Sequence, residues 1–264
     1  MIELVPVAAG SSGGDETDRT LRLTKRHLAA ALRILTAYGL SSGTALSVSA
    51  RDPSARERLW INPATLSAAR VRVADLVWVD RATLDLTGPG LDRPWLPLHS
   101  ALYGAEPDIG AVACVPSVAA AAWAMQGRPV PPVNVAVCEL YERHQIGLPP
   151  TAAEPGPGYS REVAKRFAGQ KALLVPYFGL LTTGRTVGEA VWRALTLDRA
   201  ADIALRAKAA GELKPLPFDV ARLMRSDLER LDPDHEFGPL YDETVDYEPT
   251  VLVEARSDDD VVEI

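Results

Sequence analysis

The stretch that decides the fold is ALLVPYFGLLTTGRTVGEAVWRALTLDRAADIALRA, residues 172–207. Two short apolar runs, residues 172–176 and 180–183, flank the turn Tyr177-Phe178-Gly179. Runs of this length bounded by turn residues predict a pair of β-strands. The second strand is followed directly by a helical pattern.

A long helix follows this strand pair. Thr186 and Glu189 have the T-x-x-E spacing of a capping box, in which each side chain satisfies a backbone N–H at the helix start. The Ala-rich segment beyond them predicts a helix that runs to Ala210 and ends at Gly211.

The remainder of the chain alternates between short apolar runs and helical patterns. Strands are expected over residues 45–50, 59–62, 76–80, 110–115 and 133–140. Helices are expected over residues 20–38, 99–103, from Ser117 to Gly127 and 160–167. The interleaving shows no internal repeat and no strong linker, so one α/β domain is predicted over residues 20–211. A Gly/Ser-rich flexible arm (1–19) precedes it, and an extension with an acidic tail (212–264) follows it.

Composition limits the class of protein. The chain has 264 residues, 47% of them hydrophobic, and a net charge of -7, which is typical of a globular protein and unfavourable for binding nucleic acid. No apolar run reaches the length of a membrane span, and the N-terminus lacks the basic region of a signal peptide, so a cytoplasmic protein without membrane contact is expected. With four His and two Cys, a disulfide scaffold, a zinc finger and a multi-metal site are excluded.

Five segments, in order, resemble the class II aldolase/adducin family, in its adducin-like branch. They are LSVSARDP (46–53), LWINPATL (59–66), DLVWVD (75–80), LPLHSALYGAEPDIGAV (96–112) and the opening stretch. The resemblance implies a three-layer α/β/α sandwich around a mixed, largely antiparallel sheet. It also implies a cyclic homo-tetramer with sites between subunits, in which the C-terminal extension packs on a neighbouring subunit.

The same resemblance implies a zinc site, but this chain departs from it at each metal position. The family's His-x-His pair is Cys114 and Pro116 here, and its third histidine is Phe178. The position of the family's catalytic carboxylate holds Trp95. Because a catalytic zinc needs about three N, O or S ligands, the prediction is a protein without this metal and without another cofactor.

The anion-binding turn is altered as well. The family's Gly-(Asn/His) is Leu46-Ser47 here, so the glycine that lets backbone approach a phosphate is gone, although Ser49 and Arg51 persist. Ala64-Thr65 stands where the family often has Ser-Gly. A substrate without a phosphate group is therefore expected.

Three residues are candidates for catalysis. Cys114 is a possible nucleophile or a small buried side chain, and His99 is a general base or a structural histidine. Tyr177 is the third candidate. Candidate substrate-binding residues are Ser47, Ser49, Arg51, Thr65, Trp95, Ser117 and Phe178. The aromatic side chains among them form either a pocket for a planar ligand or a filled, vestigial site. His144 is expected to be solvated, and His27 and His235 are expected at the surface.

Two classes of function remain open. The first is a metal-independent lyase, cyclase or isomerase that acts on a non-phosphorylated, partly apolar small molecule, as in bacterial secondary metabolism. The second is a non-catalytic pseudoenzyme, a ligand-binding or scaffolding subunit that assembles with an active paralogue.

Overall fold

The computed structural model describes residues 12–41, 43, 45–84, 95–151, 156–232 and 234–254. Its centre is a seven-stranded sheet in the order β3-β2-β1-β4-β7-β6-β5. The strands are β1 Ser47–Asp52, β2 Ala55–Ile61, β3 Val77–Asp80, β4 Ala111–Val115, β5 His144–Ile146, β6 Ala172–Val175 and β7 Gly179–Gly184. All neighbours run antiparallel except β5 and β6, which are parallel.

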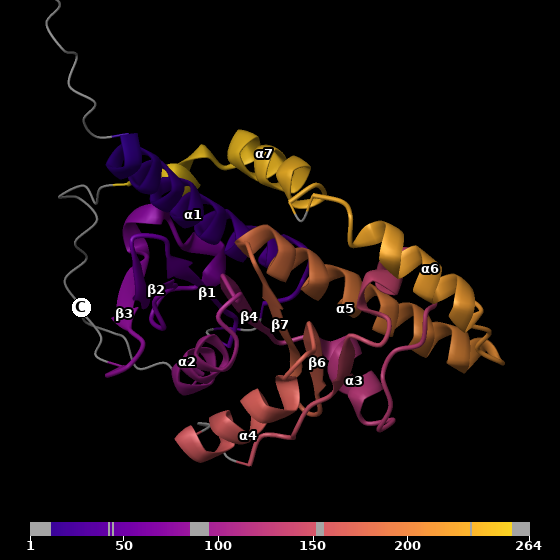
Figure 1. Ribbon diagram of the computed structural model, residues 1–264. Coiled ribbons are helices and arrows are strands. Elements are labelled where there is room, and N and C mark those ends of the chain that lie inside the picture. Colours follow the sequence, from indigo (N-terminus) through magenta and orange to yellow (C-terminus); the bar gives the residue numbers. More distant parts are fainter. Residues whose placement is uncertain are drawn as a thin grey trace, which may run out of the picture.

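Helices cover both faces of this sheet, as Figure 1 shows. They are α1 Ser12–Ala37, α2 Leu96–Ala105, α3 Val118–Ala124, α4 Pro157–Phe167, α5 Val187–Ala210, α6 Phe218–Leu228 and α7 Phe237–Tyr247. Helices α1, α3 and α5 share one buried cluster with the sheet, and α2 and α4 share the other. The predicted three-layer α/β/α sandwich around a mixed, largely antiparallel sheet is confirmed.

The strands divide their side chains between the two clusters with a period of two. On β4, Ala113 and Val115 face the α1/α5 side, whereas Val112 and Cys114 face the α2/α4 side. Both sets are apolar because helices cover both faces, which explains why these strands are continuous apolar runs in the sequence.

The stretch that decided the fold forms the predicted elements. The start of α5 is capped by the Thr186 hydroxyl, which accepts a hydrogen bond from the Glu189 N–H at 3.0 Å. The Glu189 carboxylate accepts from the N–H of Arg185, one residue before the expected partner. The helix ends at Gly211, whose φ of +155° lies in a region that favours glycine. Ser117 likewise caps α3 as predicted, accepting from the Ala120 N–H.

The strand predicted over residues 133–140 is wrong. Residues Ala136–Leu140 form a 3₁₀ helix, and the edge strand is β5, further along the chain. The Asn134 side chain accepts a hydrogen bond from the Val137 N–H at 2.9 Å, which closes a turn where the strand was expected.

The N-terminal segment is more helical than expected. Helix α1 begins at Ser12, so residues 12–19 belong to it rather than to the predicted arm, and residues 1–11 lie outside the described residues. Asp15 lies in the first turn, where a negative charge is favourable.

The C-terminal extension packs on its own chain. Phe237 of α7 is fully buried, and its ring packs on the half-buried ring of His27 on α1 with centroids 5.3 Å apart. The Tyr241 ring packs on the same histidine with centroids 4.8 Å apart. The predicted contact with a neighbouring subunit remains a prediction. The acidic tail lies outside the described residues.

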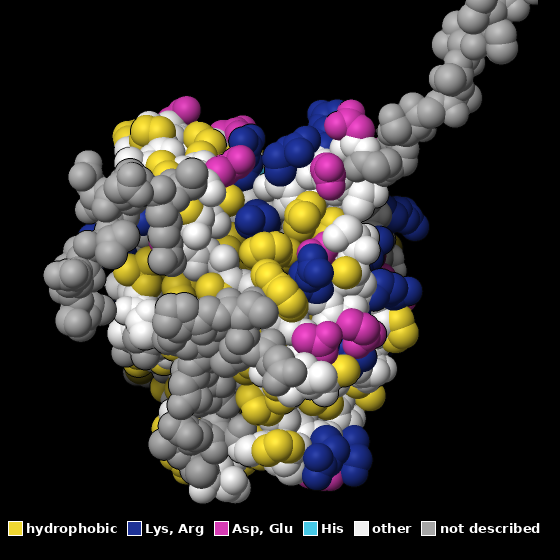
Figure 2. Space-filling model, turned by 90° about the vertical axis from the view of Figure 1, so that its left-hand side faces the viewer, with side chains coloured by type: hydrophobic (Ala, Val, Ile, Leu, Met, Phe, Trp, Pro, Cys, Tyr) yellow, Lys and Arg dark blue, Asp and Glu magenta, His cyan; other side chains and the backbone are white. Residues whose placement is uncertain are grey.

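The described residues form neither a membrane-spanning helix nor, on the face in Figure 2, a surface of one charge. Within the described residues, no helix combines the length and the apolar character that crossing a membrane requires. On the described part of the face in Figure 2, acidic and basic side chains are interspersed among hydrophobic ones.

The prediction of a solvated His144 is wrong, because this side chain is only 4% exposed. Its Nε2 accepts a hydrogen bond from the Val130 N–H at 3.0 Å, so Nδ1 carries the proton that is donated to the Leu140 carbonyl at 2.6 Å. Burial lowers the pKa of His144 below its usual value, because a charged imidazole loses its hydration there.

This arrangement predicts a pH dependence of stability. Below the unfolded pKa of about 6.5, the unfolded chain binds a proton that the folded chain resists. The free energy of unfolding should therefore fall as the pH drops from that value towards the lowered folded pKa. Denaturant unfolding of a His144→Gln variant should show a shallower pH slope, whereas Thr65→Ala, an exposed position without an ionisable group, should keep the wild-type slope. Equal slopes in the wild type and His144→Gln would contradict this assignment.

Candidate functional site

The candidate site lies where β4 ends, against the turn that joins β6 to β7. Gly179 begins β7 with a φ of +145°, and a methyl group added to it would lie 2.3 Å from both the Val115 oxygen and the Ser117 nitrogen. No side chain fits into that space, so only glycine permits this close approach of the two backbones. The contact places Tyr177 and Phe178 beside the end of β4.

Two aromatic rings meet at this turn. Trp95, which directly precedes α2, packs on Phe178 with ring centroids 4.2 Å apart. Both side chains are half-buried. Tyr177 is 75% exposed and adopts a φ of +65°, a conformation that costs free energy for a residue other than glycine. The site therefore presents aromatic surface and one exposed phenol.

The side chains at the three expected metal positions do not fit a metal ion. Pro116 and Phe178 carry no N, O or S donor in their side chains. Cys114 is fully buried and faces the apolar cluster under α2 and α4. Among the described residues, no group of three or more His, Cys, Asp or Glu side chains could hold an ion. These side chains therefore do not fit the metal ion that the family resemblance implies, and a metal-independent reaction remains a prediction.

A buried chain of hydrogen bonds connects α2 to β1. The two ring nitrogens of His99 contact Ser47 Oγ at 2.9 Å and Ser49 Oγ at 2.7 Å, and Ser49 Oγ contacts the Tyr103 hydroxyl at 3.0 Å. All four side chains are buried, and burial raises the pKa of Tyr103 far above its usual value. The hydroxyls predicted to contact a substrate thus bind His99 and hold α2 on the sheet.

Two other residues predicted to bind a substrate, Arg51 and Thr65, do not join this group. Arg51 donates to the carbonyls of Ile109, Arg56 and Tyr103, so its guanidinium ties loops together. Thr65 is exposed in the loop after β2.

Ser117 donates to Asp198 of α5 at 2.5 Å. Burial raises the pKa of Asp198, and this hydrogen bond opposes the shift. Asp198 was not predicted from the sequence, because an acid inside an Ala-rich helix resembles any solvated surface residue.

Fold and site together define the class of protein: an α/β/α sandwich of the class II aldolase type whose expected metal position is occupied by apolar and aromatic side chains. A model of the class II aldolase and adducin N-terminal domain matches residues 26–205. The chain belongs to this family, which confirms the resemblance.

Two relatives come from streptomycetes. The chain is 30% identical over 235 residues to 4-hydroxy-3-prenylphenylpyruvate oxygenase/4-hydroxy-3-prenylbenzoate synthase of Streptomyces roseochromogenus subsp. oscitans, a match that covers 87% of this chain and 84% of that protein. It is 31% identical over 202 residues to decarboxylase NovR of Streptomyces niveus, with 75% and 74% covered.

A solved structure agrees in fold. L-fuculose 1-phosphate aldolase from Glaciozyma antarctica PI12 superimposes with a TM-score of 0.77 at 23% sequence identity, over 96% of this chain and 97% of that one. At this identity the likeness supports the fold alone.

The close approach at Gly179 predicts a sharp stability effect. Gly179→Ala should lower the free energy of unfolding by at least about 2–3 kcal/mol, because the methyl group meets backbone on both sides. Gly158→Ala is the matched control, since it lies in α4 with open space around it and should be neutral or stabilise by up to about 1 kcal/mol. Denaturant unfolding of both variants measures the difference, and equal stabilities would show that the turn does not depend on this contact.

Proposed function

We propose that the chain is a metal-independent enzyme that cleaves a carbon–carbon bond in a non-phosphorylated, partly apolar small molecule with a planar ring. The observation that carries this proposal is the contact between Trp95 and Phe178. The resemblance assigns a catalytic acid and a metal ligand to these two positions. Large aromatic side chains at both positions cannot bind an ion, but they offer surface on which a ring can stack.

The surroundings of this contact disfavour a phosphate group. The glycine of the anion-binding turn is replaced by Leu46, which is buried, and the Ser47 hydroxyl is bound to His99. A planar ring, in contrast, can lie against Trp95, Phe178 and the exposed Tyr177 and bury area on each.

Tyr177 is the proposed catalytic residue. In an aldol-type cleavage a β-hydroxyl gives up its proton, the bond between the α- and β-carbons of a carbonyl compound breaks, and the β-fragment leaves as an aldehyde or ketone. The electron pair of the broken bond stays on the α-carbon as an enolate, which must then take up a proton. The Tyr177 phenol is exposed at the turn and can donate that proton, whereas Cys114 and His99 are fully buried. His99 then acts as a positioning residue, since it holds α2 and therefore Trp95 in place.

The relatives support this chemistry in two ways. One is named for a prenylated hydroxyphenylpyruvate, an aromatic compound without phosphate, and the other is named as a decarboxylase, which breaks a carbon–carbon bond. Both names suit a role in bacterial secondary metabolism. A homo-oligomer, with a second copy closing the open side of the site, completes the proposal.

One observation favours the alternative of a ligand-binding pseudoenzyme. Two of the three candidate catalytic groups, Cys114 and His99, are fully buried and face apolar or hydroxyl neighbours. In this alternative the aromatic surface binds a ligand without turnover.

Binding is the first test. Calorimetric titration with 4-hydroxyphenylpyruvate should give saturable binding, whereas L-fuculose 1-phosphate should give none. Phe178→Ala should weaken binding about tenfold, since loss of the ring removes roughly 1.4 kcal/mol of contact. Phe218→Ala on α6, whose side chain is 57% exposed, is the control and should bind normally. Tighter binding of the sugar phosphate would contradict the proposed substrate class.

A turnover assay distinguishes the enzyme from the ligand-binding pseudoenzyme. Chelator-treated protein is incubated with 4-hydroxy-4-(4-hydroxyphenyl)-2-oxobutanoate, whose cleavage gives pyruvate and 4-hydroxybenzaldehyde, and products are followed by mass spectrometry. Tyr177→Phe should lower turnover while leaving affinity unchanged, because it removes only the hydroxyl. Activity that disappears on chelation and returns with zinc would refute metal independence. Binding without any product would establish the pseudoenzyme.

A further inference from the structure

A cavity of 640 Å³ lies at the end of the sheet opposite the aromatic site. Antiparallel pairing places Ala111 of β4 beside Gly184 of β7 at this end, and Val115 beside Leu180 at the other. The cavity is lined by Gly184 and by Lys171, which precedes β6, so it lies at the opposite end of these strands from the aromatic turn. Its volume is that of a typical small-molecule pocket.

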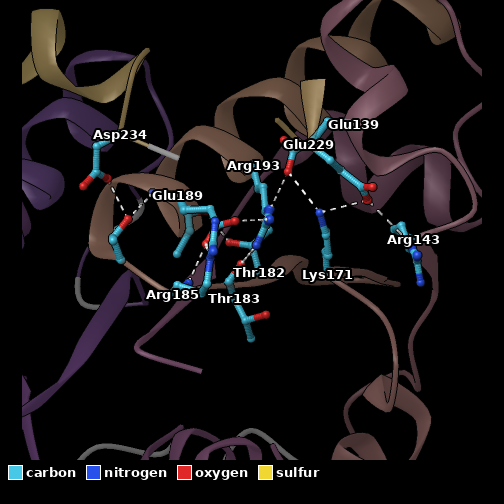
Figure 3. A network of polar contacts seen from close by, with 12 residues as sticks. Glu139, Arg143, Lys171, Thr182, Thr183, Arg185, Glu189, Arg193, Glu229 and Asp234 are labelled. Carbon is cyan, nitrogen blue, oxygen red and sulfur yellow. Dashed lines mark hydrogen bonds and ion pairs between the residues drawn. The ribbon is translucent and has the colours of Figure 1, made fainter. Parts of the chain in front are cut away.

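The floor of this cavity is a network of ion pairs, drawn in Figure 3. Arg193 is central: its side chain is 5% exposed, it pairs with Glu139 at 2.9 Å and with Glu189, and it donates to the Thr183 carbonyl at 2.7 Å. Lys171 pairs with Glu139 at 3.6 Å and with a further acid, Glu229, at 3.4 Å. The buried cation is thus satisfied by protein groups.

The charges around the cavity are unbalanced. Its three Lys and Arg side chains, Lys171, Arg185 and Arg193, all pair with acids of the network. Four further carboxylates line it and have no ion pair within the described residues: Glu106, Asp108, Asp232 and Glu236. An anionic ligand would be repelled by this excess, whereas a cationic group would be attracted by it.

The cavity also has an aromatic wall. Trp192, half-buried at the start of α5, lines it next to Val135 and Leu231, which are both more than half exposed. The face of an indole ring attracts cations as well as apolar groups. A ligand with a positive charge on a ring or an alkyl body would therefore find carboxylates for its charge and Trp192 for its body.

Two parts of the chain build this pocket. Most of its lining belongs to the segment that the family model matches, residues 26–205. The remaining lining residues lie beyond that segment: Leu228, Glu229, Leu231, Asp232, His235 and Glu236. Because the pocket needs the C-terminal extension, it is not a feature of the family domain alone.

We propose that this cavity is a binding site for an organic cation, an amine carried on an aromatic or apolar body. The ammonium group of the ligand lies among the four lining carboxylates that have no ion pair within the described residues, and the body of the ligand packs on Trp192. The site is separate from the aromatic turn, so this inference stands whether or not the proposed function holds.

The test uses three probes of nearly the same shape and different charge. Tyramine is the cation, 4-ethylphenol the neutral analogue and 3-(4-hydroxyphenyl)propionate the anion. Calorimetric titration of the full chain should show saturable binding of tyramine, at least about tenfold tighter than 4-ethylphenol, which corresponds to roughly 1.4 kcal/mol. In the Phe178→Ala variant, whose aromatic turn is weakened, the anion should bind more weakly than 4-ethylphenol, because the carboxylates of the cavity repel it. Added salt should weaken tyramine binding.

Substitutions assign the site. Asp108→Asn and Glu236→Gln should each weaken tyramine binding severalfold, and both positions are exposed, so folding should be unaffected. Glu243→Gln, an exposed acid on α7 that does not line the cavity, is the matched control. Trp192→Leu should weaken both tyramine and 4-ethylphenol, with the unfolding midpoint measured to confirm the fold.

A Phe178→Ala variant distinguishes this site from the aromatic turn and should bind tyramine normally. Loss of binding in Phe178→Ala would place the amine at the turn and overturn the proposal. Equal affinities for tyramine and 4-ethylphenol, or no saturable binding of tyramine, would overturn it as well.

Discussion

The structure depends on one close approach, that of Gly179 to the end of β4. The backbone there lies so near Val115 and Ser117 that a single methyl group would collide with both. This contact fixes where β7 begins and therefore its register with β4 in the middle of the sheet. It also brings Phe178 of the turn against Trp95, just before α2. A local restriction on one residue thus sets both the centre of the fold and the geometry of the candidate site.

The sequence predicted elements wherever local chemistry and tertiary packing favour the same structure. The β6–β7 pair, the Thr186 cap and the Ser117 cap are such cases. It failed where a local hydrogen bond overrode an apolar pattern, as at Asn134, since an apolar run alone does not distinguish a strand from a helical turn. It failed again at His144, because the Val130 N–H that binds its Nε2 lies 14 residues earlier in the chain, and only the fold brings the two together.

The candidate site was predictable in composition but not in contacts. Resemblance placed Trp95, Cys114 and Phe178 at family positions, yet it could not show that the Ser47 and Ser49 hydroxyls turn towards His99. That outcome depends on how α2 lies on β1. The charged cavity was beyond sequence reasoning, because its lining is scattered from Glu106 to Glu236 and every member resembles an ordinary surface residue.

The C-terminal extension separates two tasks. The residues of the extension that line the cavity belong to no strand, so the order of the sheet does not depend on them. Phe237, in contrast, is buried in the cluster shared by α1, α3 and α5, so it fastens the extension to the core. Substitutions among the lining residues can therefore change what the cavity admits while Phe237 keeps the segment in place, so that selectivity and stability can vary independently there.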